Sequence, residues 1–115
     1  MTDLKTTTDL LGELIALPTI SSDSNLEMIA LLANRLGDLG AEVDIQTDAT
    51  GTKANLLARI GPAEPGGIML SGHSDVVPVE DQDWSTDPFT MHCADGRLYG
   101  RGTCDMKGFI AAAVA

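Results

Sequence analysis

The stretch that decides the fold is Ile-Met-Leu-Ser-Gly-His-Ser-Asp, residues 68–75. Its first three residues are a short apolar run, which is typical of a strand covered on both faces. His73 and Asp75 follow at once, and ligands of open α/β sheets gather outside the carboxyl ends of the strands. Side chains two residues apart in an extended chain leave on the same face, so Asp75 can reach the ring of His73. The stretch predicts an α/β fold with a candidate site here. A hydrogen-bonded histidine at a polar strand end is the equally weighted alternative.

The sequence before this stretch predicts two helices and two strands. Leucine and isoleucine recur at spacings of three and four over residues 8–17, and Pro18 ends that helix. Ser24 and Glu27 have the spacing of a capping box, which predicts a second helix over residues 24–39. Gly40 is suited to the left-handed conformation that ends such a helix. Strands are predicted over residues 41–45 and 54–60.

The sequence after the stretch predicts a hairpin and a third helix. Two β-like runs, residues 89–93 and 97–99, flank an Asp-Gly turn at residues 95–96. Residues 105–115 predict an alanine-rich helix that ends without a cap, and from this we expect the chain to be truncated. The predicted fold class is therefore α/β, a mixed β-sheet flanked by helices.

Composition limits the classes of partner. The chain has 115 residues, enough for one domain, and its 17 acidic and 7 basic residues give a net charge of -10. This balance argues against nucleic acid and anionic membranes as partners. The polar start, residues 1–5, is unlike a signal peptide, so we expect a cytoplasmic protein with Cys93 and Cys104 as reduced thiols.

A second group of chemically capable residues lies in the turn at residues 100–108, which opens onto the last helix. Asp105 is by default an N-terminal helix cap, and its functional alternative is a metal ligand. A phosphate-binding loop is disfavoured because the third glycine of the fingerprint is missing. The negative charge of Asp105 also disfavours Cys104 as a nucleophile. A zinc knuckle lacks the usual Cys-x-x-Cys spacing; its members would be His73, His92, Cys93 and Cys104.

Taken together, these motifs resemble the M20 metallopeptidase family. The resemblance is carried by residues 71–79 (Ser-Gly-His-Ser-Asp-Val-Val-Pro-Val), by Trp84, by Asp87-Pro88-Phe89, and by residues 95–108, which end in Gly-Arg-Gly-Thr-Cys-Asp-Met-Lys-Gly. It implies that residues 1–115 are the N-terminal part of a zinc-peptidase-like catalytic domain. The dimerisation domain inserted in the family is expected to be absent from these residues.

The resemblance also implies roles for three side chains. His73 would bind one metal ion, Asp75 would orient His73 as a catalytic residue, and Asp105 would bridge two divalent metal ions. Zinc is the expected metal, with cobalt as the alternative. A carboxylate can bind one metal ion through each of its two oxygens and so span the gap between them. The remaining ligands and the glutamate general base are expected beyond Ala115, so the 115-residue fragment is expected to be inactive alone.

The function implied by the resemblance is metal-dependent hydrolysis of an amide bond. Residues 103–109 are most similar to family members that release ornithine and acetate from N2-acetyl-L-ornithine in arginine biosynthesis. The alternatives are removal of succinate from succinyl-diaminopimelate, hydrolysis of other N-acyl amino acids, carboxypeptidase activity, or a non-catalytic binding module. The expected partner is a small N-acyl amino acid, and the whole protein is expected to be a homodimer.

Overall fold

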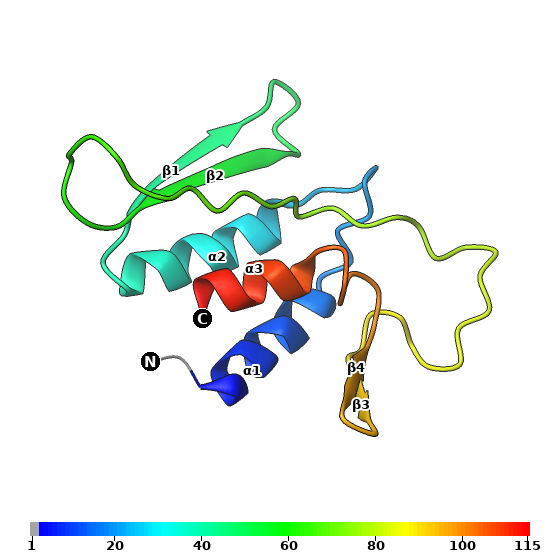
Figure 1. Cartoon of the computed structure of the whole chain (residues 1–115). Helices are drawn as coiled ribbons and strands as arrows, with labels where there is room; N and C mark the ends of the chain where they lie inside the picture. The colour runs from blue at the N-terminus through cyan, green and yellow to red at the C-terminus, as the bar shows by residue number, and fades with distance from the viewer. Residues whose placement is uncertain (1–2) are drawn as a thin grey trace.

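The computed structural model describes residues 3–115, which form three helices and two antiparallel hairpins (Figure 1). In chain order these elements are α1 (Leu4–Ile15), α2 (Leu26–Asp38), β1 (Glu42–Thr47), β2 (Ala54–Arg59), β3 (His92–Ala94), β4 (Arg97–Tyr99) and α3 (Lys107–Val114). The predicted α/β class is confirmed. Each sheet of the described residues has two strands, β1 with β2 and β3 with β4.

Helix α1 starts four residues earlier than the leucine spacing predicted. The side chain of Asp3 accepts a hydrogen bond from the backbone N–H of Thr6 at 2.7 Å, which supplies the N-terminal cap. The helix ends at Ile15, ahead of Pro18, as expected from the restricted backbone before a proline.

Helix α2 ends as predicted but begins differently. At its C-terminus Gly40 has φ of 85°, and the N–H of Ala41 donates to the carbonyl of Leu36 at 3.0 Å. This is the Schellman arrangement, which needs a residue that tolerates positive φ. The predicted capping box is wrong, because the helix starts at Leu26 and the cap position is Asn25, whose side chain makes no capping bond.

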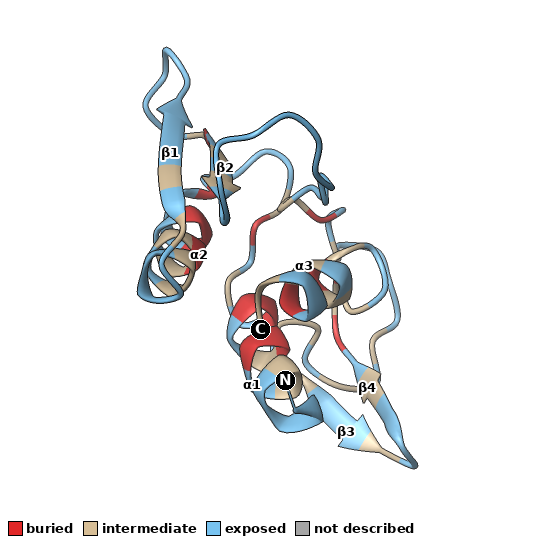
Figure 2. Ribbon diagram, turned by 60° about the vertical axis from the view of Figure 1, so that its left-hand side comes forward, coloured by how far each residue is buried: buried red, intermediate tan, exposed pale blue. Residues whose placement is uncertain are grey.

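The core lies where the three helices meet. Figure 2 shows the buried positions gathered on the facing sides of α1, α2 and α3. The leucine stripe of α1 supplies most of this cluster, which consists of Leu10, Leu11, Leu14, Ile15, Met28, Leu32 and Ala111. The β1–β2 hairpin packs against α2. None of the helices within residues 3–115 has the length and apolar character needed to cross a bilayer.

The β3–β4 hairpin forms as its turn residues predicted. Asp95 and Gly96 have φ of 51° and 72°, the left-handed pair that a tight two-residue turn requires. Met91, just before β3, and Leu98, in β4, pack against the helical core. The hairpin therefore sits beside α1 and leads the chain toward the 100–106 turn.

The strand predicted over residues 68–70 is wrong. This run has no regular secondary structure, and Ile68 and Met69 are 92% and 79% exposed. A short apolar strand is stable only with neighbouring strands and covered faces, and the described residues provide neither here. The segment is fixed further along instead, where Val76 pairs in parallel with Ile20 in an isolated bridge.

Candidate metal centre

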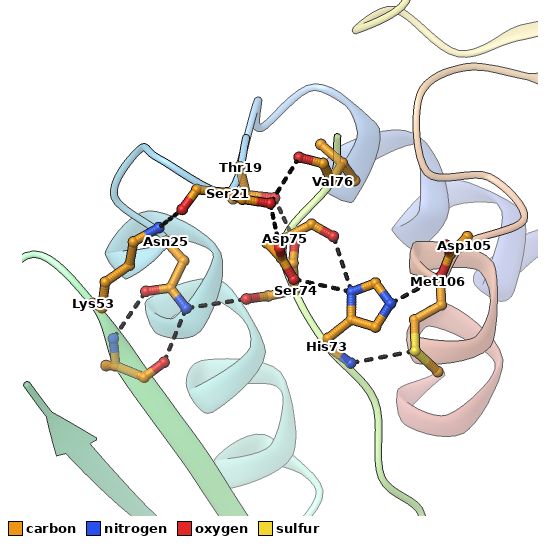
Figure 3. A network of polar contacts seen from close by, with 11 residues as sticks. Thr19, Ser21, Asn25, Lys53, His73, Ser74, Asp75, Val76, Asp105 and Met106 are labelled. Atoms are coloured by element: carbon orange, nitrogen blue, oxygen red, sulfur yellow. Dashed lines mark hydrogen bonds and ion pairs between the residues drawn. The ribbon is translucent and has the colours of Figure 1, made fainter. Parts of the chain in front are cut away.

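His73 lies between two carboxylates that are distant from each other in sequence (Figure 3). Its Nε2 is 2.9 Å from Oδ1 of Asp105, and its Nδ1 is 3.1 Å from Oδ1 of Asp75. The backbone carbonyl of Asp75 is also 3.0 Å from Nδ1. The structure thus brings together all three side chains singled out in the sequence, although no strand precedes His73.

Asp75 is held in place by the segment that follows helix α1. The N–H of Val76 donates to the carbonyl of Thr19 at 2.9 Å, and the N–H of Ser21 donates to the carbonyl of Val76 at 3.0 Å. The hydroxyl of Ser21 donates to Oδ2 of Asp75. Residues 19–21 therefore fix both the backbone around Asp75 and its carboxylate.

Asp105 comes from the turn between β4 and α3. Helix α3 begins at Lys107 with Met106 at the cap position, so the default interpretation of Asp105 as a helix cap is wrong. Its side chain turns to His73 and is 84% exposed. The neighbouring Met106 approaches from the same side, with its sulfur accepting the N–H of His73 at 3.3 Å.

A buried lysine next to the turn ties it to the C-terminal end of α1. Lys107 has no exposed surface, and its Nζ donates to the carbonyls of Leu14 and Leu17 at 2.8 and 2.7 Å. These carbonyls lie at the C-terminal end of α1, where the helix dipole favours a cation. Burial lowers the pKa of Lys107 to about 8.

The two carboxylates set the protonation of the site. The pKa of His73 is raised mainly by its hydrogen bond to Asp105, and its contacts with Asp75 raise it further. The pKa of Asp75 is lowered mainly by the hydrogen bond from Ser21, and the nearby imidazole of His73 lowers it further. The arrangement therefore favours a charged imidazolium next to an ionised Asp75 carboxylate.

A shallow pocket of about 210 Å³ opens over these side chains. His73, Asp75 and Asp105 line it, together with Val77 from the chain after the site and the turn 100–104. His73 is half exposed, with 48% of its side chain accessible. A small polar molecule or a cation can therefore reach Nε2 and the Asp105 carboxylate directly.

The donor atoms suit a divalent cation, but the set is small. Imidazole nitrogen and carboxylate oxygen are normal ligands of zinc, and the 2.9 Å between Nε2 and Oδ1 lets one ion contact both. The hydrogen bonds of Asp75 to Nδ1 resemble the outer support that metal-bound histidines usually have. Within residues 3–115 no group of three or more His, Cys, Asp or Glu side chains is arranged to hold a metal ion. The zinc knuckle is therefore not formed.

Sequence reasoning missed the residues that support the site. Ser21 contacts Asp75 from 54 positions away along the chain, and Lys107, next to the turn, contacts carbonyls that lie 93 and 90 positions away. Asn25 joins them: its amide pairs with both backbone groups of Ala54 at 2.9 Å and donates to the hydroxyl of Ser74 at 3.0 Å. No local pattern marks these contacts; the only signal was the polar run after Pro18.

Comparison with known proteins gives this geometry a family context. Residues 69–115 match peptidase family M20/M25/M40. The chain is 48% identical over 110 residues to acetylornithine deacetylase of Pectobacterium carotovorum subsp. carotovorum (strain PC1), covering 90% of this chain and 28% of that protein. It is 49% identical over 105 residues to acetylornithine deacetylase of Shigella sonnei (strain Ss046), covering 85% of this chain and 27% of that protein.

The chain thus spans little more than a quarter of the length of the curated relatives it matches. The matched residues include His73, Asp75 and Asp105, so the family match and the clustered side chains concern the same part of the molecule. The resemblance predicted from the sequence is confirmed: residues 69–115 of this chain match peptidase family M20/M25/M40.

Proposed function

We propose that this chain supplies part of the metal site of a metal-dependent amide hydrolase. The observation that carries the proposal is the 2.9 Å approach of His73 Nε2 to the Asp105 carboxylate, with Asp75 on the opposite ring nitrogen. His73 and Asp105 would hold the metal, and Asp105 has a second carboxylate oxygen for a second ion. Zinc is the proposed metal, with cobalt as the alternative.

Each side chain has a separate task in this proposal. Asp75 would accept a hydrogen bond from Nδ1–H of His73, which keeps the proton of the neutral imidazole on Nδ1 and leaves the Nε2 lone pair for the metal. Asp105 contributes negative charge at an exposed position, where it offsets the charge of the cation. A divalent ion bound there would acidify a bound water and polarise the scissile carbonyl. The pocket beside Val77 and the 100–104 turn would receive the acyl end of the substrate.

The proposed substrate is N2-acetyl-L-ornithine, giving L-ornithine and acetate, a reaction of arginine biosynthesis. The names of the relatives support this choice over succinyl-diaminopimelate, other N-acyl amino acids and peptides. We further propose that residues 1–115 are the N-terminal portion of the catalytic domain. The whole protein is proposed to be a cytoplasmic homodimer that binds neither nucleic acid nor membrane.

Zinc binding tests the metal site without any need for turnover. Zinc is titrated calorimetrically into the complete gene product and into its variants His73→Ala, Asp105→Asn and His92→Ala. The first two variants are expected to lose binding. His92→Ala is the matched control, because it removes a histidine that lies on the β3–β4 hairpin and not in the candidate site. Because a proton competes for Nε2, affinity should rise up to about tenfold per pH unit below the raised pKa of His73. Equal zinc affinity of His73→Ala and wild type would contradict the proposal.

The substrate is tested by acetate release from N2-acetyl-L-ornithine by the complete gene product. Turnover is expected to stop with a chelator and to return on addition of zinc or cobalt. Succinyl-diaminopimelate serves as the competing substrate and is expected to react more slowly. If none of these N-acyl compounds is hydrolysed in a metal-dependent way, the proposed function is wrong.

A further inference from the structure

We propose that Ser21 is a positioning residue of the candidate metal centre. Its hydroxyl orients the Asp75 carboxylate toward Nδ1 of His73, and through that contact it directs Nε2 toward Asp105. The consequence for metal binding rests on the proposed function. The positioning itself rests on contacts within the chain and can be tested without a metal.

The backbone around Asp75 is fixed on both sides by residues 19–21. The hydroxyl of Thr19 donates to the carbonyl of Ser74 at 2.5 Å, and the Thr19 carbonyl accepts the N–H of Val76 at 2.9 Å. The N–H of Ser21 then donates to the carbonyl of Val76 at 3.0 Å. Thr19 and Val76 are buried, so water competes little for these bonds. The Asp75 backbone consequently has one defined position.

The Asp75 side chain is not fixed by packing. It is 47% exposed, so its carboxylate can turn about its own torsions unless polar contacts hold it. Its two oxygens have separate partners: Oδ1 faces His73 and Oδ2 accepts the hydroxyl of Ser21. Removing the hydroxyl frees Oδ2 and with it the orientation of Oδ1. Ser21 therefore controls the side-chain contact with Nδ1, while the backbone carbonyl of Asp75 at 3.0 Å keeps a second contact.

Ser21 is itself held in position. Lys53 Nζ donates to the carbonyl of Ser21 at 2.9 Å and also to the carbonyl of Asp23. The support therefore runs from Lys53, the residue before β2, through Ser21 to Asp75 and His73, as Figure 3 shows. These contacts hold the backbone of Ser21, whose hydroxyl donates to Asp75 and also lies 3.4 Å from the carbonyl of Val76.

The neighbouring serine provides a matched control. The hydroxyl of Ser22 donates to Oδ1 of the adjacent Asp23 at 3.3 Å, and Ser22 is exposed like Ser21. Ser22→Ala removes the same atom from the same loop without touching Asp75. Ser21→Thr keeps the hydroxyl and is the rescue variant. Ser21→Cys keeps the size but weakens the donor, and replaces Ser21→Ala should that variant not fold.

The first measurement is the 15N spectrum of the imidazole of His73 in the metal-free chain, at one fixed pH. Ser21→Ala is expected to change the Nδ1 signal and the fraction of His73 side chains that are protonated at Nδ1. Ser22→Ala and Ser21→Thr are expected to match the wild type. Urea unfolding accompanies each variant, so a change in the ring signals at unchanged stability is not a loss of fold. Ring signals of Ser21→Ala that coincide with those of Ser22→Ala would overturn the proposal.

The second measurement is the zinc affinity of the complete gene product by calorimetry. Support of a metal-bound histidine is typically worth about 10- to 100-fold in affinity, and Ser21 acts one step further out. We therefore expect about a tenfold loss for Ser21→Ala and no loss for Ser22→Ala. If wild type fails to bind zinc, the proposed function fails, but the ring spectra still decide the role of Ser21. If zinc binds equally to Ser21→Ala and wild type, Ser21 does not position the ligand.

Discussion

Lys107→Met is the most direct probe of how the turn carrying Asp105 is held. Lys107 is fully buried and spans from α3 to the end of α1, where its ammonium donates to the carbonyls of Leu14 and Leu17. Methionine has a similar length and no charge. The substitution removes the cost of burying an ammonium and leaves two carbonyls without their donor.

The two effects have similar size at pH 7. Burial lowers the pKa of Lys107 from 10.5 to about 8, which corresponds to a cost of about 3 kcal/mol while the amine is charged. Loss of the donor costs about 1–3 kcal/mol for each carbonyl left unpaired. We therefore expect the stability of Lys107→Met at pH 7 to lie between about 1 kcal/mol above and about 3 kcal/mol below that of wild type.

The pH dependence separates the two effects. A lysine whose pKa is lower in the folded state binds more protons when unfolded between pH 8 and pH 10.5. Stability of wild type relative to Lys107→Met should therefore rise with pH across this window, by about 2 kcal/mol between pH 7 and pH 9.5. Below pH 8 both states carry the proton, and the difference should be constant.

Urea unfolding at pH 7 and pH 9.5 measures this difference, because ionisations shared by both proteins cancel. Lys5→Met, which changes an exposed lysine of α1, is the matched control and should follow the wild type at both pH values. Equal pH dependence of wild type and Lys107→Met would refute the account of Lys107 as a buried ammonium. A fall in the relative stability of wild type with pH would refute its sign.

Two further substitutions test the contacts that hold the loops together. Asn25→Ala should lower the free energy of unfolding by about 2–3 kcal/mol in urea titrations, because both backbone groups of buried Ala54 lose their partner. Asn34→Ala, at an exposed position, is the control and should change the free energy of unfolding by less than about 0.5 kcal/mol. Equal effects of the two substitutions would contradict the role of Asn25. Gly102→Ala should cost more than about 2 kcal/mol, because φ is 88° and the new methyl would lie 2.8 Å from a side-chain carbon. Gly61→Ala, with φ of 102° and open space around it, should cost only about 1 kcal/mol, and an equally small loss at Gly102 would show that the turn can relax.

The fold was predictable where the signal is local. The leucine spacing of residues 8–17 predicted α1, and the Asp95-Gly96 turn predicted the β3–β4 hairpin. The helix predicted over residues 24–39 is present as α2, although the capping box that predicted it is wrong. Each of these depends on residues within a few positions of one another. The strand at residues 68–70 depends on neighbours in space, and an apolar run alone does not show whether such neighbours exist.

The candidate site divides in the same way. The two-residue spacing of His73 and Asp75 predicted their contact, and the structure brings them together even though the chain there is not a strand. Asp105 had two interpretations, and only the course of the turn before α3 shows that it is not the helix cap. No local pattern pointed to Ser21, because its contact with Asp75 depends on the bridge between Ile20 and Val76, which are far apart in the sequence. The metal-binding roles of these residues stay a prediction.

The contacts of His73 connect positions 32 residues apart, and those of Asp75 connect positions 54 residues apart. Bringing such distant parts of a polymer together costs chain entropy that is recovered only once the whole molecule has condensed. A cation held by His73 and Asp105 would therefore bind the native state and not the denatured state. At a hundred times its dissociation constant it would raise the melting temperature through about 2.7 kcal/mol of added stability, which makes thermal shift a sensitive gauge of occupancy.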